Sequence, residues 1–387
     1  MELIYQNFDK LELSFKGSLS IAVLENLANA KKRAQDEKLE EVLTEIGKTN
    51  IQVMVSPNGM KGGYAYVFNT GSIGEIWAIK HDLRANQWNI RISVRSLNLA
   101  INGYDKVKES IFKTLRNLDA ILSPRVSPRT GKIISDYEES IARVDYCFDF
   151  ISDSFSPDPD NIVMHSHMKM KLHEENKKPL KTVKQGKRYI TITAGCMPNK
   201  QIQIYDKTKE VSEKRKNYWF KIWNIGNLQK NQKIWRVEVR LGKDFLSKTV
   251  KIKTFNEIEN QLPQILQNVL TQTRYIKPSF TNNNITRAPM ENFWKECIKE
   301  SINCITFKPK MHSEETFKEL LLMQRIETYE NLILGNTISY ANALGFTFEK
   351  LPECIKTVSE RNIETLKCNI ETYKKRFLKA KERLSLI

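Results

Sequence analysis

The sequence predicts an α+β domain followed by an all-helical domain. Apolar and polar residues alternate strictly in three segments, 87–95, 143–150 and 234–241, and this period of two is that of a β-strand. Helical patterns with one apolar stripe lie between such segments, and no strand pattern continues beyond about residue 255. We therefore place the α+β domain at residues 1–250 and the helical domain at 251–387.

The first part of the chain reads as alternating strands and helices. Turn residues, above all Gly, Pro, Asn and Ser, separate the segments. Predicted strands cover 8–15, 51–55, 64–68, 74–80 and 87–95, and predicted helices cover 19–47 and 104–122. The expected core of the first helix is Leu24, Leu27, Leu39, Val42 and Ile46. The stretch 123–131 reads as a loop because it contains two prolines and a glycine.

The strand at 143–150 is followed by a break and then by a second strand-rich region. A Ser-, Asp- and Pro-rich stretch at 152–161 ends the sheet pattern. The remaining expectations here are a helix at 162–175, a basic loop at 177–188, a hairpin formed by 189–193 and 201–207, and the strand at 234–241.

Beyond residue 255 the chain reads as helices. We expect them at 255–275, 289–304, 314–334, 338–345 and 358–385, with a linker at 281–285. In the last helix, apolar residues recur at 3-4 spacing from Ile363 to Leu384. This heptad fits either a short coiled coil or a helix that packs on the protein's own helices. The stretch 333–346 has a spacing that fits a helix-turn-helix or an ordinary turn in a helical bundle.

The charge of the chain is strongly positive. With 62 Lys and Arg against 45 Asp and Glu, the formal net charge is +17. This predicts a polyanionic partner, nucleic acid first and an anionic membrane second, although a basic surface without a partner is the alternative. No run of about 18 apolar residues is present, so we expect no membrane span. The N-terminal segment lacks a basic start before an apolar run and is not expected to be a signal peptide. The six cysteines have no metal-site spacing and fit reduced thiols in the cytoplasm.

Two carboxylates lie on one face of the strand at 143–150. Arg143, Asp145 and Asp149 point one way, and the aromatic residues point the other. Aspartate is depleted in strands, so a metal ion, a buried arginine pair or a solvated face is needed to explain the two acids.

The same polar face continues on two other strands. Its arginines could bind phosphate groups, and its carboxylates could hold a hard divalent cation. The alternative is a solvated face with ion pairs between strands. The arginines are Arg91, Arg95, Arg143, Arg236 and Arg240, and the carboxylates are Asp145, Asp149 and Glu238.

The hairpin strand at 201–207 adds a tyrosine to this face. Tyr205 and Lys207 share the polar side, whereas Asp206 is in phase with the apolar residues at the strand end. Without further information, Tyr205 also fits an ordinary amphipathic sheet tyrosine, and Asp206 fits an Asx turn.

Three short motifs occur in order: Arg143-x-Asp145-x-x-x-Asp149, Ile204-Tyr-Asp-Lys207 and Trp235-Arg-x-Glu238. This set resembles the Rep-trans group of rolling-circle replication initiators, which includes plasmid initiators and relaxases of integrative elements. The resemblance covers roughly residues 5–250. It implies a fold related to the HUH nucleases, with helices packed on a central antiparallel sheet.

The resemblance also implies an activity. A tyrosine, here Tyr205, would attack a DNA phosphodiester and stay joined to the 5′ phosphate, with Lys207 beside it. Asp145, Asp149, Glu238 and, more weakly, Asp206 would hold Mg²⁺ or Mn²⁺. The implied partner is origin DNA, single- and double-stranded. A host helicase and a second copy of the chain are further expected partners, in the cytoplasm of a bacterial cell that carries a mobile element or phage.

One position departs from the group's pattern. Relatives often carry an acid on the strand where this chain has Ser93, and serine is a poor metal ligand. A catalytically inactive origin- or operator-binding protein is therefore the alternative function. Tyr218 and Tyr275 are other candidate nucleophiles, although ordinary structural roles fit them better. His165 and His167 cannot share one ion from one face of a helix, because residues two apart point about 200° away from each other.

Overall fold

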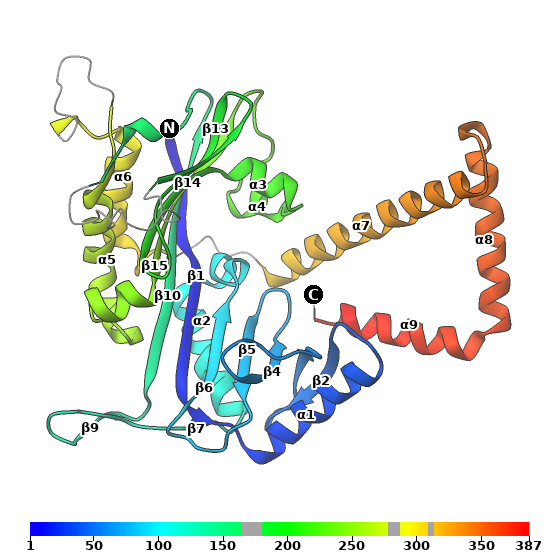
Figure 1. Cartoon of the computed structure of the whole chain (residues 1–387), viewed down its shortest axis with the longest axis horizontal. Helices are drawn as coiled ribbons and strands as arrows, with labels where there is room; N and C mark the ends of the chain where they lie inside the picture. The colour runs from blue at the N-terminus through cyan, green and yellow to red at the C-terminus, as the bar shows by residue number, and fades with distance from the viewer. Residues whose placement is uncertain (165–179, 278–286, 309–312, 387) are drawn as a thin grey trace, which may run out of the picture.

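The computed structural model describes residues 1–164, 180–277, 287–308 and 313–386. A large antiparallel sheet with helices packed on it forms the body, and a helical region follows, which confirms the predicted fold class (Figure 1). The sheet has twelve strands, and its main path runs β12-β13-β14-β15-β10-β1-β6-β5-β4-β3-β2. The strands of this path are β1 Glu2–Ser18, β2 Val42–Ile46, β3 Ile51–Val55, β4 Tyr64–Asn69, β5 Glu75–Lys80, β6 Trp88–Val94, β10 Glu139–Ser152, β12 Leu180–Gln185, β13 Arg188–Gly195, β14 Lys200–Asp206 and β15 Lys233–Gly242.

Short strands and nine α-helices complete the described part of the chain. β7 Ile121–Leu122 pairs with β1, β8 Arg125–Val126 with β9 Ile133–Ser135, and β11 Ile162–Met164 with β16 Thr273–Tyr275. The helices are α1 Ile21–Asp36, α2 Ser96–Asn117, α3 Lys207–Glu213, α4 Tyr218–Ile222, α5 Phe255–Gln272, α6 Asn292–Glu300, α7 Glu314–Ala343, α8 Leu351–Cys368 and α9 Ile370–Leu384. None of the helices in the described ranges is long and apolar enough to cross a membrane.

One face of the sheet carries the main core. Alternate residues of β10, such as Val144, Tyr146 and Phe148, are fully buried there, in a core that also contains residues of α1, α2, α5 and α6. The predicted boundary at residue 250 precedes α5, yet α5 and α6 pack into this same core through residues such as Leu266 and Trp294.

The opposite, polar face is partly covered. Trp219 of α4, Trp223 directly after α4, Val211 of α3 and Phe317 of α7 are buried over one end of it. This cover determines which of the polar side chains remain accessible.

The predicted helix at 19–47 is wrong in its second half. The helix ends at Asp36, and Lys38 adopts a positive φ of 52°, which reverses the chain. The backbone N–H of Leu39 then donates to the carbonyl oxygen of Ala34 at 2.8 Å, as in a helix C-cap. Val42 and Ile46 are buried as predicted, but they belong to β2.

The predicted helix at 104–122 also differs. α2 begins at Ser96 and changes direction at Gly103, whose φ of 72° is left-handed backbone that suits glycine. It ends at Asn117, because the next residues turn so that Ile121 and Leu122 pair with β1.

Other local predictions meet mixed outcomes. The hairpin of 189–193 and 201–207 is confirmed as β13 and β14. The expected loop at 123–131 contains β8, and the expected basic loop contains β12. Ile162–Met164 is a strand, not a helix start, since it pairs with β16, and residues 165–175 lie outside the described residues together with His165 and His167.

The C-terminal region differs in how its helices are divided. α7 runs unbroken through both predicted helices, so a helix-turn-helix at 333–346 is excluded. The predicted helix at 358–385 is two helices that meet at Asn369, where ψ is 41°. α7 leads away from the sheet, α8 turns, and α9 returns to the body beside α1 and β2 (Figure 1). The linker predicted at 281–285 lies outside the described residues.

Candidate active site on the polar face of the sheet

Three neighbouring strands bring the predicted site residues together. Glu238 on β15, the middle strand, pairs in register with Cys147 of β10 on one side and Gln203 of β14 on the other. Asp145 and Tyr205 are each two residues from those partners, so both lie diagonal to Glu238 on the same face.

Tyr205 and Glu238 are in direct contact. The phenol of Tyr205 donates a hydrogen bond to Oε2 of Glu238 at 3.0 Å. Burial, together with the negative charge of Glu238, raises the pKa of Tyr205 well above its usual value. The phenol is therefore protonated at neutral pH, with a carboxylate placed to accept its proton.

Asp145 and Glu238 are two buried carboxylates, each covered by one arginine. Arg143 donates to both oxygens of Asp145 at 2.6–3.0 Å, and Arg240 donates to Oε1 of Glu238 at 2.7 Å. Only 2% of either carboxylate side chain is exposed, against 29% of Arg143 and 23% of Arg240. Burial raises the pKa of Asp145 to about 7 despite the bonds from Arg143, and the charge of Glu238 adds to this rise. Asp145 is thus short of positive charge.

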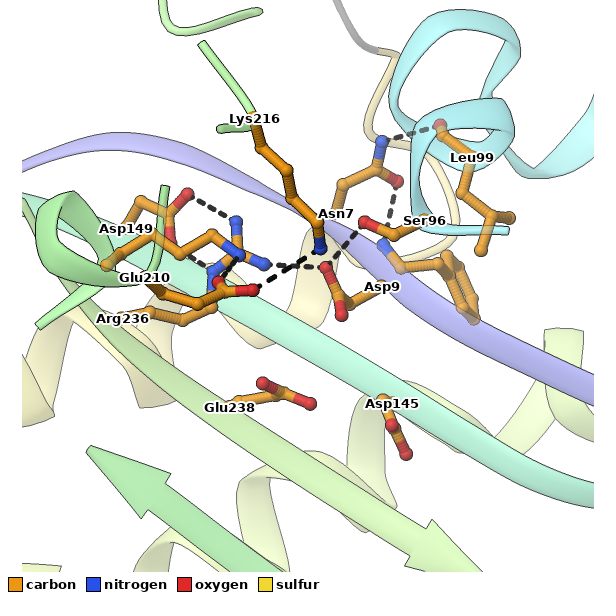
Figure 2. Close-up of polar contacts among 12 residues, drawn as sticks. Asn7, Asp9, Ser96, Leu99, Asp145, Asp149, Glu210, Lys216, Arg236 and Glu238 are labelled. Atoms are coloured by element: carbon orange, nitrogen blue, oxygen red, sulfur yellow. Dashed lines mark hydrogen bonds and ion pairs between the residues drawn. The ribbon is translucent and has the colours of Figure 1, made fainter. Parts of the chain in front are cut away.

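Asp149 and Arg236 form a second, closed group farther along the same strands (Figure 2). Arg236 donates to both oxygens of Asp149 at 2.6 and 2.7 Å, and the indole of Trp223 donates to Oδ2 at 2.7 Å. Arg236 also donates to Asp9 at 2.6 Å, and its guanidinium lies 4.5 Å from the ring centre of Trp219. Both side chains of the pair are fully buried. These contacts occupy the groups that were predicted to bind metal and phosphate.

Lys207 and Asp206 follow Tyr205 and point in different directions. The ammonium of Lys207 pairs with Glu210 and lies 5.7 Å from the ring centre of Tyr205. Burial, and next the charge of Arg236, lower the pKa of Lys207. Asp206 accepts from the backbone N–H of Lys209 as the N-cap of α3, and its other oxygen accepts from Lys233 at 2.7 Å. Asp206 thus has structural partners, and the sequence phase correctly indicated that it turns away.

The remaining predicted arginines lie on or beside β6. Arg91 pairs with Glu12 at 2.8 Å and keeps over a third of its side chain exposed. Arg95 immediately precedes α2, and burial lowers its pKa. Ser93, the position that lacks an acid, accepts a hydrogen bond from the Lys10 ammonium at 2.7 Å. A lysine therefore points to this part of the face.

Sequence reasoning missed Asp9 and Lys10, which both point to the polar face. The pairing of β1 with β10 is irregular between Phe8 and Lys10, so Asp9 is an extra residue of a β-bulge. The signal was present in the spacing: Phe8 and Leu11 are both buried in the main core although they lie three residues apart. An unbroken strand cannot place such a pair on one face.

The other candidate residues are not assembled here. The hydroxyl of Tyr275 accepts from the backbone N–H of Asp158 at 2.9 Å, and the ring is buried beside Phe293, which is a structural role. Within the described ranges, no group of three or more His, Cys, Asp or Glu residues is arranged to hold a metal ion.

A cavity of about 620 Å³ opens near the end of the same strands. Its lining includes Arg188 and Lys233 together with the aromatic rings of Phe155, Tyr189 and Trp235. Because Thr191 pairs with Tyr205, Tyr189 lies only two residues farther along β13 than the partner of Tyr205. Cations and aromatic rings therefore lie next to the strand that carries Tyr205.

Comparisons with known proteins do not identify a family for this chain. No protein-family model matches the chain, and no curated protein matches it. Among solved structures, it is similar to a rolling-circle replication initiator protein from Geobacillus stearothermophilus, at 14% identity and a TM-score of 0.39. That match covers 79% of this chain and 98% of the other. A likeness this weak establishes neither a shared family nor a shared activity.

Proposed function

We propose that this protein nicks and rejoins one DNA strand at an origin to start rolling-circle replication, with Tyr205 as the nucleophile. The observation that carries the proposal is the 3.0 Å contact between the Tyr205 hydroxyl and Glu238, with Asp145 on the next strand. The ordered motifs of these strands and the net charge of +17 favour DNA as the substrate.

The reaction follows from the position of the phenol. Its oxygen attacks the phosphorus of a phosphodiester, its proton passes to Glu238, and the bond from phosphorus to the 3′ oxygen breaks. The product is a 5′ phosphotyrosine and a free 3′ hydroxyl, which takes up a proton. Attack by a DNA 3′ hydroxyl on the phosphotyrosine reverses the step and rejoins the strand.

Asp145 and Glu238 are the residues that would hold Mg²⁺ or Mn²⁺. Mg²⁺ is commonly bound by one or two carboxylates, with phosphate oxygens and water as the other ligands, so two acids suffice. The raised pKa of Asp145 fits this role, because a cation beside two crowded carboxylates would favour their charged forms. When bound, such an ion offsets the charge that develops on the phosphate. Asp149 stays outside this set because its partner Arg236 is fully buried and cannot turn away, and Asp206 because it caps α3 and turns away from Tyr205.

In this proposal, the partly exposed arginines bind the phosphate groups of the DNA backbone. Arg143 and Arg240 cover the two acids with flexible side chains and can turn toward phosphate oxygens, which guanidinium groups bind in pairs. Arg91 lies on the same face. Arg236 has no such freedom, because it is fully buried.

The test uses supercoiled DNA that carries the protein's own origin, with Mg²⁺ or Mn²⁺. Open circles with protein attached to the 5′ end are expected, and Tyr205→Phe should lose both the circles and the adduct while keeping the fold. Tyr218→Phe is the matched control and should keep both. Loss of the adduct in Tyr218→Phe alone would move the nucleophile to that residue. No nicking of the correct origin with either ion would overturn the proposal.

A second candidate is a DNA-binding protein that recognises an origin or operator without cutting. It is favoured by the ion pairs: each acid beside Tyr205 already has an arginine, and no third metal ligand joins them among the described residues. This candidate predicts salt-sensitive DNA binding without a covalent product. Recovery of a tyrosine peptide linked to DNA would exclude it.

A further inference from the structure

The C-terminal arm, which we define as residues 314–386 with helices α7, α8 and α9, exposes many apolar side chains. It contains seventeen of the twenty-seven large hydrophobic side chains that are exposed in the described part of the chain. Monomeric proteins rarely expose continuous apolar patches beyond a few hundred Å². The arm is therefore short of a packing partner.

α7 presents an apolar stripe that no other described segment covers. Leu322, Ile326, Tyr329 and Ile333 follow one another at 4-3-4 spacing, so they share one face of the helix. Between 39% and 67% of each side chain is exposed. The helix has 30 residues and is therefore about 45 Å long, but at its first turns only Phe317 is fully buried against the body.

α9 presents a second stripe. Ile370, Tyr373 and Phe377 continue the heptad at 3-4 spacing, and 72% of Phe377 is exposed. Lys379 anchors this helix to the body through Glu37, and the carbonyl oxygen of Leu386 accepts from the backbone N–H of Ser72 at 3.0 Å. α7 and α9 form different sides of the arm, joined by α8, so neither stripe covers the other (Figure 1).

The two helices carry opposite charges. α7 contains five glutamates against two Lys or Arg, whereas α9 contains six Lys or Arg against two glutamates. Opposite charges beside an apolar seam set the partner choice of paired helices. An α7–α7 or α9–α9 contact would bring like charges together, whereas an α7–α9 contact brings opposite charges together.

We propose that a second copy of this chain covers the arm, with α7 of each copy packed on α9 of the other. The contact is reciprocal, as in a dimer with two-fold symmetry, and each copy contributes both helices. The seven side chains of the two stripes form the apolar centre of this contact, and the charged side chains of the two helices form its rim. The proposal does not depend on DNA nicking.

The first test is the mass of the full chain in solution by light scattering after gel filtration. At about 10 µM we expect twice the 45.1 kDa of one chain. Ile333→Ser and Phe377→Ser should each raise the dissociation constant of the dimer at least about tenfold. Ile133→Ser removes an equally exposed isoleucine from β9 and should change nothing.

Charge exchange gives the sharper test. Glu327→Lys with Glu330→Lys on α7 should weaken the dimer, and so should Lys374→Glu with Lys375→Glu on α9. All four changes in one chain should restore it, because α7 would then be basic and α9 acidic. A single-chain mass at every concentration, including one caused by α7 closing on α9 of its own chain, would overturn the proposal. So would a dimer that none of these variants weakens.

Discussion

Asp145 and Asp149 lie four residues apart on β10, and each is paired with an arginine. The two pairs differ in the side chains that cover them. Asp149 and Arg236 lie beneath Trp219 of α4 and the adjacent Trp223. Both oxygens of Asp149 accept hydrogen bonds from Arg236, and one also accepts from Trp223. Asp145 lies beneath only the flexible side chain of Arg143 and next to a second carboxylate. The same residue types therefore make a structural ion pair at one position and a candidate reactive site at the other.

This difference shows that the role of each carboxylate depends on the side chains packed over it, not on the strand that carries it. Tryptophan rings exclude water and fix the guanidinium of Arg236, so the charges must satisfy each other completely. Arg143 and Arg240 instead remain partly exposed, so their guanidinium groups can reach a phosphate from the surface of the sheet. The following predictions test this contrast.

Asp149→Asn should have the largest effect on folding. It leaves the charge of Arg236 buried without its main partner, and losing one partner of a buried pair costs about 3–5 kcal/mol. The free energy of unfolding from urea titration measures this. Asp145→Asn, the matched change on the same strand, should cost less than about 1 kcal/mol. Equal losses in the two variants would contradict the contrast.

Asp145→Asn should instead have the larger effect on activity. Removing a proposed ligand of the ion should lower the rate of nicking at the origin by about 100-fold or more. Affinity for the same DNA without a divalent ion should stay within about threefold, since the asparagine carries no charge to repel phosphate. Rates that match the unchanged protein would show that Asp145 takes no part in the reaction.

Binding of Mn²⁺ should depend on pH through Asp145. Because its pKa is raised to about 7, protons compete with the ion below that value, and affinity should fall about tenfold per pH unit from 7 downward. Titration calorimetry between pH 5.5 and 8.5 measures this. The raised pKa also means that Asp145 contributes stability at low pH that is lost as the pH rises from about 4 to 7. In Asp145→Asn both dependences should flatten.

Arg240→Gln should have the smallest effect. If this side chain turns to a phosphate, its loss should reduce the slope of log affinity against log salt by about one, with a modest loss of affinity. Arg84→Gln, at an exposed arginine in the turn before β6, serves as the control. Identical slopes for both variants would place Arg240 outside the DNA interface.

Sequence patterns predicted part of this arrangement. Strict alternation identified β6, β10 and β15, and the phase of β14 correctly placed Tyr205 on the polar face and turned Asp206 away. The alternation could not distinguish the roles of Asp145 and Asp149, because both lie on the same face of the strand. Their environments differ because α4, which is distant in sequence, packs over Asp149. The split between α1 and β2 was also hidden, since Val42 and Ile46 fit the period of a helix and of a strand.

The bulge at Asp9 affects how this site can change during evolution. Before it, Tyr5 and Asn7 face the polar side; after it, Lys10 and Glu12 do. Deleting Asp9 would remove the bulge and leave Phe8, Lys10 and Leu11 in strict alternation, so the later residues of β1 would keep the faces that they have now. This deletion would remove one contact of Arg236 but would leave Leu11, Leu13 and Phe15 in the core. A one-residue deletion at the bulge is therefore the change of length that β1 should tolerate best in a descendant that still folds.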